Sequence, residues 1–502
     1  MSESVINAIV AAPPAAGHRI TFQRLDGSTT MALTDLHAAA ERLARGLRAA
    51  GIGEGDRIGI LASNGPEWVL LDLAALRLKA VTAGFEPGKF DPGEALADRY
   101  RLAVLFTDRP ASGRRIRPVA DLARLAGSGP LPVPGYGPAD ITTIKFTSGS
   151  TGEPKGLAAT AGSIDDSINA VQEMFEHTAG DNLFLFLPLS LLQQRYWIYS
   201  ALRFGHDVTV STYEAAFPAL RRAGATVVMG VPAFYETARR HIEARAARGA
   251  GLQAAARELF GDRIRYLWTG SAPARPSMLR FFTEAGMPIY EGYGLNETCI
   301  VSKNHPRAHR EGSAGQVLPG KKVILDADGV ISISSEHPVN WRYEYAAPGE
   351  SERVFAPDGT VRTGDLGYID DDGFLFIRGR ADDVIVLDNG KKVIVRPLEE
   401  YLKACPAIDE CVVLCPAQTQ LVAVVSPAGD PPDTAAITAR LAQANAVFAR
   451  DEQIARLIIA PERFSTGNGL LTSQFKPRRQ VIAQTYLTQT YLTPPTAKDQ
   501  NS

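Results

Sequence analysis

The stretch Thr147-Ser-Gly-Ser-Thr-Gly-Glu-Pro-Lys-Gly156 follows an apolar run, residues 141–146, that is typical of a buried strand. Small and hydroxyl-bearing residues pack poorly in a core, but they expose backbone N–H groups that bind phosphate oxygens. Lys155 adds a mobile positive charge for the same oxygens. The P-loop motif is absent, because Pro154 precedes this lysine and Gly156 follows it. The stretch predicts a phosphate-binding loop of another kind; the alternative is a surface loop between two elements.

Further motifs follow this loop in order along the chain. They are Tyr290-Glu-Gly-Tyr-Gly-Leu-Asn-Glu297, Thr363-Gly-Asp365, Gly379-Arg380 and Leu470-Leu-Thr-Ser-Gln-Phe-Lys476. Together with the loop, this set resembles the signature of the adenylate-forming superfamily, which contains acyl-CoA synthetases, nonribosomal adenylation domains and luciferases. The resemblance covers nearly the whole chain, and around residues 468–479 it is strongest to long-chain acyl-CoA synthetases.

The composition of the chain argues against several classes of protein. Its 502 residues exceed the roughly 250–300 that one hydrophobic core supports, so we expect more than one domain. A net charge of −2 gives no basic field for nucleic acid. The longest apolar run, residues 183–192, is too short for a membrane span, and residues 1–18 lack the pattern of a secretion signal. Cys405, Cys411 and Cys415 are not spaced like zinc ligands, and the four cysteines fit a cytoplasmic protein.

Apolar runs that alternate with helical patterns predict a parallel α/β architecture for the first part of the chain. We expect helices over residues 33–51 and from Pro66 onward, and another after Ser163. The expected strands are residues 57–61, 103–107, 141–146, 183–186 and 226–229. From about residue 310 to 378, short strands broken by Gly, Asp and Pro predict a β-rich subdomain, after which an α/β pattern resumes.

The resemblance implies how these parts form domains. A large N-terminal domain, residues 1–381, would hold two doubly wound α/β subdomains plus a β-barrel-like subdomain. A small, mobile α+β C-terminal domain, residues 382–486, would follow a hinge at Asp382. Residues 487–502 lack periodicity, and we expect them to be a disordered tail.

By the same resemblance, the motifs form one site for ATP. The loop would hold the β- and γ-phosphates, and Tyr293 would stack on the adenine, with Glu291 and Gly292 along the adenine edge. Asp365 would accept hydrogen bonds from the ribose, and Arg380 would contact the ribose or a phosphate. The expected ATP-binding residues are Thr147, Ser148, Gly149, Ser150, Thr151, Gly152, Lys155, Ser271, Ala272, Pro273, Glu291, Gly292, Tyr293, Gly294, Asn296, Asp365, Arg380 and Lys476.

The resemblance implies four catalytic residues: Lys155, Asn296, Glu297 and Lys476. Glu297 would hold Mg²⁺, a hard ion that takes a carboxylate and keeps several waters. Lys476 would serve adenylation from the C-terminal domain. Asn296 departs from the family, which usually has a threonine whose hydroxyl contacts the α-phosphate. The asparagine amide has a donor of similar reach, so we expect altered but not abolished activity.

The second half-reaction, thioester formation, is expected to use residues 389–392. They resemble the loop beside the tunnel for the pantetheine arm of coenzyme A. Gly390 would leave room for the thiol arm to pass the backbone. Lys391 and Lys392 either meet coenzyme A phosphates or are simply solvated. The phosphopantetheine of an acyl-carrier protein is the alternative acceptor.

The segment 187–195 resembles the block that lines the acyl pocket. Leu191 stands where the family usually has histidine, whereas Arg195 matches the arginine of long-chain enzymes. No acid stands where amino-acid-activating relatives grip the substrate ammonium, so a fatty or aryl acid without an α-amino group is the expected substrate. The expected pocket residues are Leu191, Arg195, Tyr196, Trp197 and Met229.

Three hypotheses of function follow. The first is an ATP-dependent ligase that forms acyl-AMP and then a thioester on coenzyme A. The second is a ligase that loads an acyl-carrier protein. The third is a repurposed, non-catalytic nucleotide-binding relative, in which Asn296 and Leu191 mark the loss of chemistry; the intact Lys155, Glu297 and Lys476 argue against it.

Overall fold

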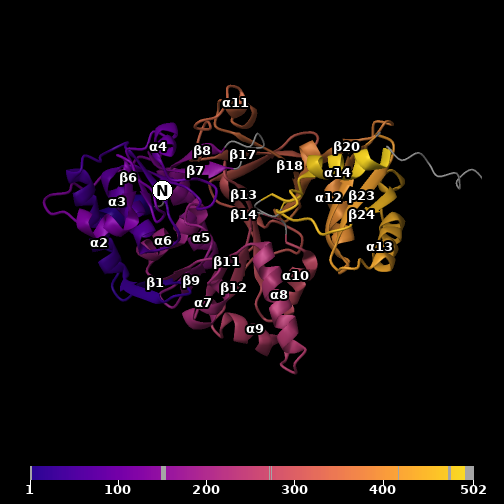
Figure 1. Ribbon diagram of the computed structural model, residues 1–502, viewed down its shortest axis with the longest axis horizontal. Coiled ribbons are helices and arrows are strands. Elements are labelled where there is room, and N and C mark those ends of the chain that lie inside the picture. The colour runs from indigo at the N-terminus through magenta and orange to yellow at the C-terminus, as the bar shows by residue number, and fades with distance from the viewer. Residues whose placement is uncertain are drawn as a thin grey trace, which may run out of the picture. The chain divides into compact units, whose positions relative to one another are not determined.

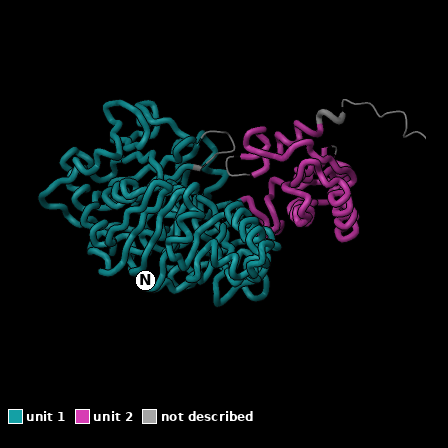
Figure 2. Tube along the Cα trace, turned by 60° about the horizontal axis from the view of Figure 1, so that its bottom comes forward, with its two compact units in different colours: residues 1–325, 331–363, 369–376 teal, residues 326–330, 364–368, 377–502 magenta. Residues whose placement is uncertain are grey.

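The computed structural model describes residues 3–147, 154–270, 272, 274–416, 418–472 and 476–491. Two compact units make up the chain (Figure 2). The first unit consists of residues 1–325, 331–363 and 369–376. The second consists of residues 326–330, 364–368 and 377–502.

A six-stranded sheet holds the first part of unit one. Its strand order is β6-β5-β3-β4-β7-β8, parallel except for the antiparallel pair β7–β8. The strands are β3 Arg57–Leu61, β4 Val81–Gly84, β5 Val104–Thr107, β6 Ile116–Pro118, β7 Ile141–Thr147 and β8 Lys155–Thr160. The accompanying helices are α2 Leu33–Ala49, α3 Pro66–Leu78, α4 Glu94–Arg99 and the 3₁₀ helix η1 Val119–Leu125.

Helices α2 and α3 form for different reasons. Helix α2 is amphipathic, because Leu36, Leu43 and Leu47 recur at helical spacing and are buried on one face. Helix α3 has Pro66 in its first turn, where the missing N–H costs nothing, and it is buried nearly all round.

A nine-stranded sheet forms the second part of unit one, in the order β15-β14-β13-β12-β11-β9-β10-β1-β2 (Figure 1). Strands β13 to β1 in this order run parallel, and the pairs at both ends are antiparallel. The strands are β1 Arg19–Gln23, β2 Ser28–Ala32, β9 Asn182–Leu185, β10 Asp207–Ser211, β11 Val227–Gly230, β12 Tyr266–Thr269, β13 Ile289–Leu295, β14 Cys299–Lys303 and β15 Gln316–Val317.

Both faces of this sheet are covered. Alternate strand residues enter different cores: Trp268 and Met229 pack with one set of helices, whereas Leu267 and Val228 pack with the other. The first set consists of α1 Val5–Ala11, α5 Ala161–Phe175 and α6 Leu192–Phe204, which share a core with α2 and α3. The second consists of α7 Ala216–Ala223, α8 Pro232–Ala246, α9 Leu252–Phe260 and α10 Pro276–Glu284. The predicted doubly wound α/β fold is therefore confirmed.

A four-stranded sheet, in the order β16-β17-β18-β19, occupies the predicted β-rich region. Its strands are β16 Lys321–Leu325, β17 Val330–Ser335, β18 Val361–Ile369 and β19 Leu375–Arg380, and α11 Glu350–Val354 lies between β17 and β18 in the sequence. Turns with left-handed glycines, such as Gly329 and Gly373, connect these short strands.

The second unit has an α+β core of its own. A three-stranded sheet, in the order β22-β23-β24, packs against helices through Leu398, Leu402 and Ile437. The elements are β20 Val384–Val386, β21 Lys392–Ile394, α12 Val395–Lys403, β22 Ile408–Leu414, β23 Leu421–Pro427, α13 Thr434–Val447, β24 Ile454–Ile459 and α14 Arg479–Tyr491, with the 3₁₀ helices η2 Ala381–Asp383 and η3 Arg450–Glu452.

Two features differ from the sequence expectations. Helix α14 continues to Tyr491, so residues 487–491 of the expected disordered tail are helical, and residues 492–502 lie outside the described residues. Strand β8 precedes α5, where we expected no strand. Within the described ranges, no helix combines the length and the apolar character needed to cross a membrane.

Candidate active site

Four charged or aromatic side chains meet around the start of β8. The Lys155 ammonium lies 2.8 Å from Oε1 of Glu350 and 5.2 Å from the centroid of the Tyr343 ring. The Tyr343 hydroxyl donates a 2.7 Å hydrogen bond to Oε1 of Glu297. Two backbone hydrogen bonds between Gly156 and Glu344, of 2.9 and 2.7 Å, hold β8 against the loop that carries Tyr343. We call Lys155, Glu297, Tyr343 and Glu350 the Tyr343 cluster.

The charges of the Tyr343 cluster stabilise one another. The hydrogen bond from Lys155, helped by the backbone N–H of Ala347, holds the pKa of Glu350 below its usual value. Burial, together with the negative charge of Glu297, raises the pKa of Tyr343, so its phenol stays protonated and donates. The cluster thus contains one ammonium, Lys155, paired with the Glu350 carboxylate, and a second carboxylate, Glu297, linked to Lys155 through Tyr343.

The oxygen donors of this cluster suit Mg²⁺ better than a metal ion that needs three or more protein ligands. Among the residues that the structure describes, no group of three or more His, Cys, Asp or Glu side chains could hold a metal ion. Mg²⁺ commonly takes only one or two carboxylates and completes its shell with water and substrate phosphates. Glu297 suits that role.

The motif residues before Glu297 lie on β13. Glu291, Gly292 and Tyr293 are half-buried there, and Oε1 of Glu291 accepts a 2.9 Å hydrogen bond from the Ala274 N–H. Gly294 sits at a β-bulge against β14, where an added Cβ would lie 2.0 Å from the Cys299 carbonyl oxygen. The glycine at 294 is therefore required for packing.

Asn296 is exposed in the turn that joins β13 to β14. The Thr298 hydroxyl accepts a 3.0 Å hydrogen bond from the Leu295 N–H, which fixes this turn. The turn sets Asn296 and Glu297 next to each other at the end of β13.

Three expected nucleotide residues come together within the second unit. Nη1 of Arg380 lies 3.0 Å from Oδ1 of Asp365. An added Cβ on Gly364 would lie 2.8 Å from Nη2 of Arg380, and its φ is +70°, so the middle residue of the Thr-Gly-Asp motif must be glycine. Partial burial lowers the pKa of Lys476, although the residue remains exposed to solvent; the Asp365 charge opposes this shift and the Arg380 charge adds to it.

The remaining expected residues of the second unit lie on exposed turns. Asp382 is in η2, with Oδ2 3.8 Å from Nη2 of Arg380. Gly390 has a φ of +81° in the hairpin turn between β20 and β21. Lys391 pairs with Asp451, and Nζ of Lys392 lies 2.7 Å from Asp328. Both lysines of this loop therefore have carboxylate partners within their own unit.

The expected acyl-pocket residues are mostly core. Leu191 is 38% exposed, whereas Arg195, Tyr196, Trp197 and Met229 are at most 3% exposed. Trp197 packs edge-to-face on Trp268, 4.9 Å between ring centroids.

Arg195 has its charge neutralised inside the protein. Its Nη1 lies 2.9 Å from Oδ1 of Asp72, its Nη2 donates to the Thr143 hydroxyl at 3.0 Å, and its guanidinium lies 5.0 Å from the Trp68 ring centroid. The Tyr199 hydroxyl donates to the other oxygen of Asp72 at 2.5 Å. This network shows that Arg195 supports the packing of α6 against α3.

Part of the expected site lies outside the described residues: Ser148, Gly149, Ser150, Thr151 and Gly152, and also Ser271 and Pro273. Thr147 ends β7, and Ala272 is half-buried.

Sequence reasoning missed Tyr343, Glu350 and Lys303. Tyr343 stands in the irregular segment 340–349, whose signal is the aromatic and charged run Trp341-Arg-Tyr-Glu-Tyr345, and Glu350 begins α11. Lys303 lies buried at the end of β14, and a lysine inside an apolar strand was its signal.

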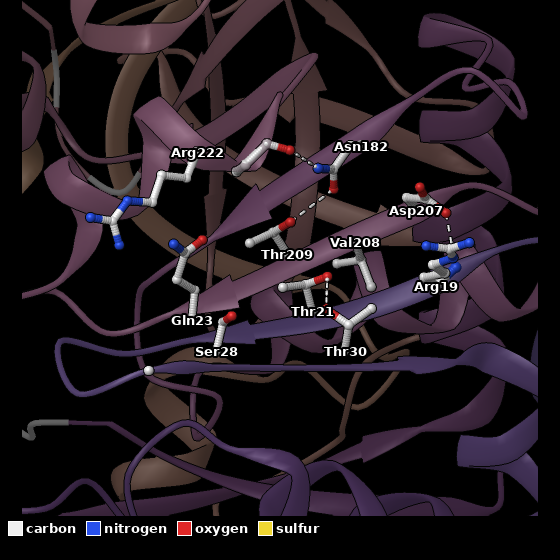
Figure 3. Close-up of a pocket in the computed structure, with 12 residues that line it drawn as sticks. Arg19, Thr21, Gln23, Ser28, Thr30, Asn182, Asp207, Val208, Thr209 and Arg222 are labelled. Atoms are coloured by element: carbon white, nitrogen blue, oxygen red, sulfur yellow. Dashed lines mark hydrogen bonds between the residues drawn. The ribbon is translucent and has the colours of Figure 1, made fainter.

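A separate groove lies on the face of the nine-stranded sheet at its β1–β2 end (Figure 3). Threonines project into it, with 3.0 Å between the hydroxyls of Thr21 and Thr30, and a 3.1 Å hydrogen bond from Thr209 to Asn182. None of the expected site residues lines this groove, so its polar face is not the site that the motifs form.

Comparison with known proteins matches the chain to one family in two segments. The family described as AMP-binding enzyme matches residues 12–332, and the AMP-binding enzyme C-terminal domain matches residues 382–489. The long-chain-fatty-acid–CoA ligase FadD15 of Mycobacterium bovis is 28% identical, over 93% of this chain and 93% of that protein. Feruloyl-CoA synthase of an Amycolatopsis species is 26% identical, over 77% of this chain and 81% of that protein.

Two solved structures share the fold along nearly the whole chain. The anthranilate CoA ligase AuaEII, in complex with anthranoyl-AMP, has a TM-score of 0.79 at 18% identity and covers 98% of both chains. The o-succinylbenzoate CoA synthetase of Bacillus subtilis, in complex with its acyl-adenylate, has a TM-score of 0.76 at 21% identity, over 95% of this chain and 97% of that one.

Proposed function

The chain belongs to the AMP-binding enzyme family, and from that premise we propose that it is an ATP-dependent acid–thiol ligase. A carboxylate oxygen of the acid would attack the α-phosphorus of ATP, and the bond to pyrophosphate would break. The thiol of coenzyme A would then attack the acyl carbon of the acyl-AMP, releasing AMP and leaving a thioester. The substrate is a fatty or aryl acid without an α-amino group, in line with relatives named for fatty-acid and feruloyl ligation.

The observation that carries the proposal is the Tyr343 cluster. The first step brings two anions together, so a catalyst has to neutralise charge and hold both reactants in place. Lys155 supplies an ammonium that is held by Glu350 and the Tyr343 ring, 14% exposed and therefore partly desolvated. At this low exposure the ammonium interacts more strongly with its partners than it would in bulk water, and phosphate oxygens would compete with Glu350 for it.

Glu297 would hold Mg²⁺ at the other end of the Tyr343 side chain. When bound, the ion neutralises phosphate charge. The hydrogen bond from Tyr343 orients the Glu297 carboxylate, as partners of ligating carboxylates usually do. Asn296, next in the same turn, is proposed to donate to the α-phosphate.

The second unit is proposed to contribute Lys476, Asp365 and Arg380 to the same reaction. Asp365 would accept from the ribose, because a carboxylate is the usual partner of ribose hydroxyls. A lowered pKa at Lys476 fits an ammonium that leaves water when it serves the transferred phosphate.

The test is acid-dependent exchange of radiolabelled pyrophosphate into ATP, with Mg²⁺ and a panel of fatty, aryl and amino acids. Fatty or aryl acids should support exchange, and amino acids should not. Lys155→Met should abolish exchange, whereas Lys79→Met, which removes a lysine bound to Glu54 and Asp140, should leave it unchanged. If ATP binds but no acid supports exchange, the chain is a non-catalytic nucleotide-binding relative.

The acceptor is tested separately by adding coenzyme A or a phosphopantetheinylated carrier protein to the preformed acyl-AMP complex. Thioester formation with coenzyme A supports the proposal. Transfer only to the carrier protein would identify a carrier-loading ligase.

A further inference from the structure

Lys303 is a lysine inside the protein core. It ends β14 and is 0% exposed. Its ammonium donates hydrogen bonds to the carbonyl oxygens of Thr269, at 3.0 Å, and Tyr290, at 2.7 Å. It also lies 3.6 Å from the centroid of the Trp268 ring.

A buried lysine is costly, because desolvation disfavours its charged form. Burial lowers the pKa of Lys303 well below its usual value, and the negative charge of Glu291 opposes that shift. A methionine would fill the same space without this cost. The two carbonyls that Lys303 binds therefore indicate what the amine is for.

Those carbonyls lie where two neighbouring strands separate. Strands β12 and β13 pair in parallel up to Thr269 and Glu291. Beyond that point the chain after β12 leaves the sheet, whereas β13 continues and pairs with β14. Lys303 binds one carbonyl from each strand at this end of the ladder and so bridges the two strands.

A second side chain crosses the same gap. Oε1 of Glu291 accepts a hydrogen bond from the Ala274 N–H, so Ala274 is tied to β13 directly, and Thr269 is tied to it through Lys303. Gly292 packs directly on the lysine stem, because an added Cβ there would lie 2.6 Å from Cδ of Lys303. A change at Lys303 is thus transmitted to the backbone at Gly292.

We propose that Lys303 is a positioning residue for the nucleotide, which fixes the spacing between the end of β12 at Thr269 and residues 291–295 of β13. This inference rests on the proposed function, in which Ala272, just after β12, and residues 291–294 of β13 contact ATP. Lys303 acts through the backbone carbonyls and touches no substrate itself. The expected effect is therefore on nucleotide affinity, which is measured without the acid.

The experiment compares Lys303→Met, Lys303→Arg and the control Arg77→Met. Arg77 is also a buried cation, 8% exposed, which donates to the Val10 carbonyl and lies 3.2 Å from Oε2 of Glu41, away from the motif segments. Affinities for ATP and AMP are measured by calorimetry without acid, and KM is measured for ATP and for the acid.

Lys303→Met should weaken ATP and AMP binding about tenfold, equivalent to about 1.4 kcal/mol, and raise the KM for ATP with the acid KM unchanged. Arg77→Met should lower the melting temperature, as Lys303→Met does, but change neither affinity. Lys303→Arg keeps the charge and the donors but not their compact geometry, so it should give a smaller, about threefold, loss confined to the nucleotide.

If Lys303→Met does not fold, the nucleotide affinity of Lys303→Arg tests the inference. Unchanged nucleotide affinity in the folded Lys303 variants, or a rise in the acid KM instead, would overturn the inference. Failure of the unmodified protein to bind ATP at all would instead overturn the proposed function.

Discussion

The Tyr343 hydroxyl donates a 2.7 Å hydrogen bond to Glu297, and the ring of the same tyrosine lies 5.2 Å from the Lys155 ammonium. One aromatic residue thus links a carboxylate from the turn after β13 to a lysine at the start of β8. The two charges are neighbours in space although they are far apart in the chain. Their distance from each other depends on a residue that none of the motifs contains.

Removing the hydroxyl tests this link. Tyr343→Phe keeps the ring under Lys155 but loses the hydrogen bond to Glu297. Since a hydrogen bond to a charged group contributes about 1.5–3 kcal/mol, adenylation should slow roughly 10- to 100-fold, with a higher Mg²⁺ requirement.

Tyr345→Phe is the matched control, because the Tyr345 hydroxyl bonds Arg57 and the Tyr100 carbonyl and not Glu297. Pyrophosphate exchange at several Mg²⁺ concentrations measures both variants. Equal rates for the two would show that Tyr343 does not orient the carboxylate.

Asn296 tests whether an amide replaces the family's threonine at the α-phosphate. Asn296→Thr should retain activity, because the hydroxyl offers a donor of its own. Asn296→Ala should lose about 1–3 kcal/mol of transition-state stabilisation, the effect of one lost donor. Steady-state kinetics of both variants provide the comparison. An alanine variant with unchanged kcat/KM would mean that the side chain does not reach the reacting phosphate.

Arg195→Met tests whether this residue serves packing or the acyl pocket. Removing the guanidinium leaves Asp72 buried without its cation, and breaking such a pair usually costs about 3–5 kcal/mol. Urea unfolding should show that loss. Arg239→Met, which breaks a more exposed pair with Glu243, should cost less than about 1 kcal/mol. A raised acid KM with unchanged stability would instead restore Arg195 to the acyl pocket.

His177 should make the protein sensitive to acid. Burial, helped by the neighbouring His206, lowers the pKa of His177 to about 3, whereas Asp181 opposes the shift. Below pH 6.5, His177 therefore binds a proton in the unfolded chain but not in the native state. The free energy of unfolding falls as the pH drops from 6.5 towards 3.

The largest loss from this one group is about 5 kcal/mol, since each pKa unit is worth about 1.4 kcal/mol. His177→Gln should flatten the dependence of the unfolding free energy on pH over this range, although it lowers stability at pH 7 by disturbing the 2.6 Å contact with Tyr266. Urea unfolding from pH 4 to 7 measures both slopes. Parallel slopes would assign the acid sensitivity to other groups, with the buried His206 as the next to test.

The sequence predicted most of the core elements, because their periodicity is strong. The strand 57–61 has the bounds of β3, and the helix 33–51 ends within two residues of α2. Strand β8 was not predicted, because Lys155-Gly-Leu-Ala-Ala-Thr160 has little β-propensity of its own. Its pairing with β7 makes it a strand, and a partner in the sheet cannot be deduced from local spacing.

The residues of the candidate site also fall into those that the sequence predicted and those that it did not. Residues inside ordered motifs, such as Lys155 and Glu297, could be named from the sequence because several motifs support one another. Tyr343 could not, because it lies in an irregular segment and acts through its contacts. Arg195 was predicted for the acyl pocket from its segment alone; its ion-pair partner Asp72 is 123 positions away, and local spacing does not predict such a buried pair.

The last prediction concerns the two half-reactions and the second unit. Lys476 and Gly390 lie on different elements of this unit, and the resemblance to adenylate-forming enzymes assigns Lys476 to adenylation and Gly390 to thioester formation. Lys476→Ala should depress acyl-AMP formation by several kcal/mol of barrier, as expected for the loss of a major electrostatic stabiliser. Thioester formation from supplied acyl-AMP should survive in this variant, because the resemblance gives the lysine no part in that step.

Gly390→Trp should have the opposite effect, since an indole would obstruct the thiol arm and leave adenylation intact. The φ of +81° means that any side chain strains this turn, so Gly390→Asn, a residue that tolerates left-handed backbone, controls for strain without bulk. The open space around Gly390 gives the indole no internal clash. Both half-reactions are assayed for all three variants. Equal losses in the two steps for Lys476→Ala and Gly390→Trp would rule out a division of labour between the two residues, and an asparagine variant as impaired as the tryptophan variant would assign the effect to backbone strain.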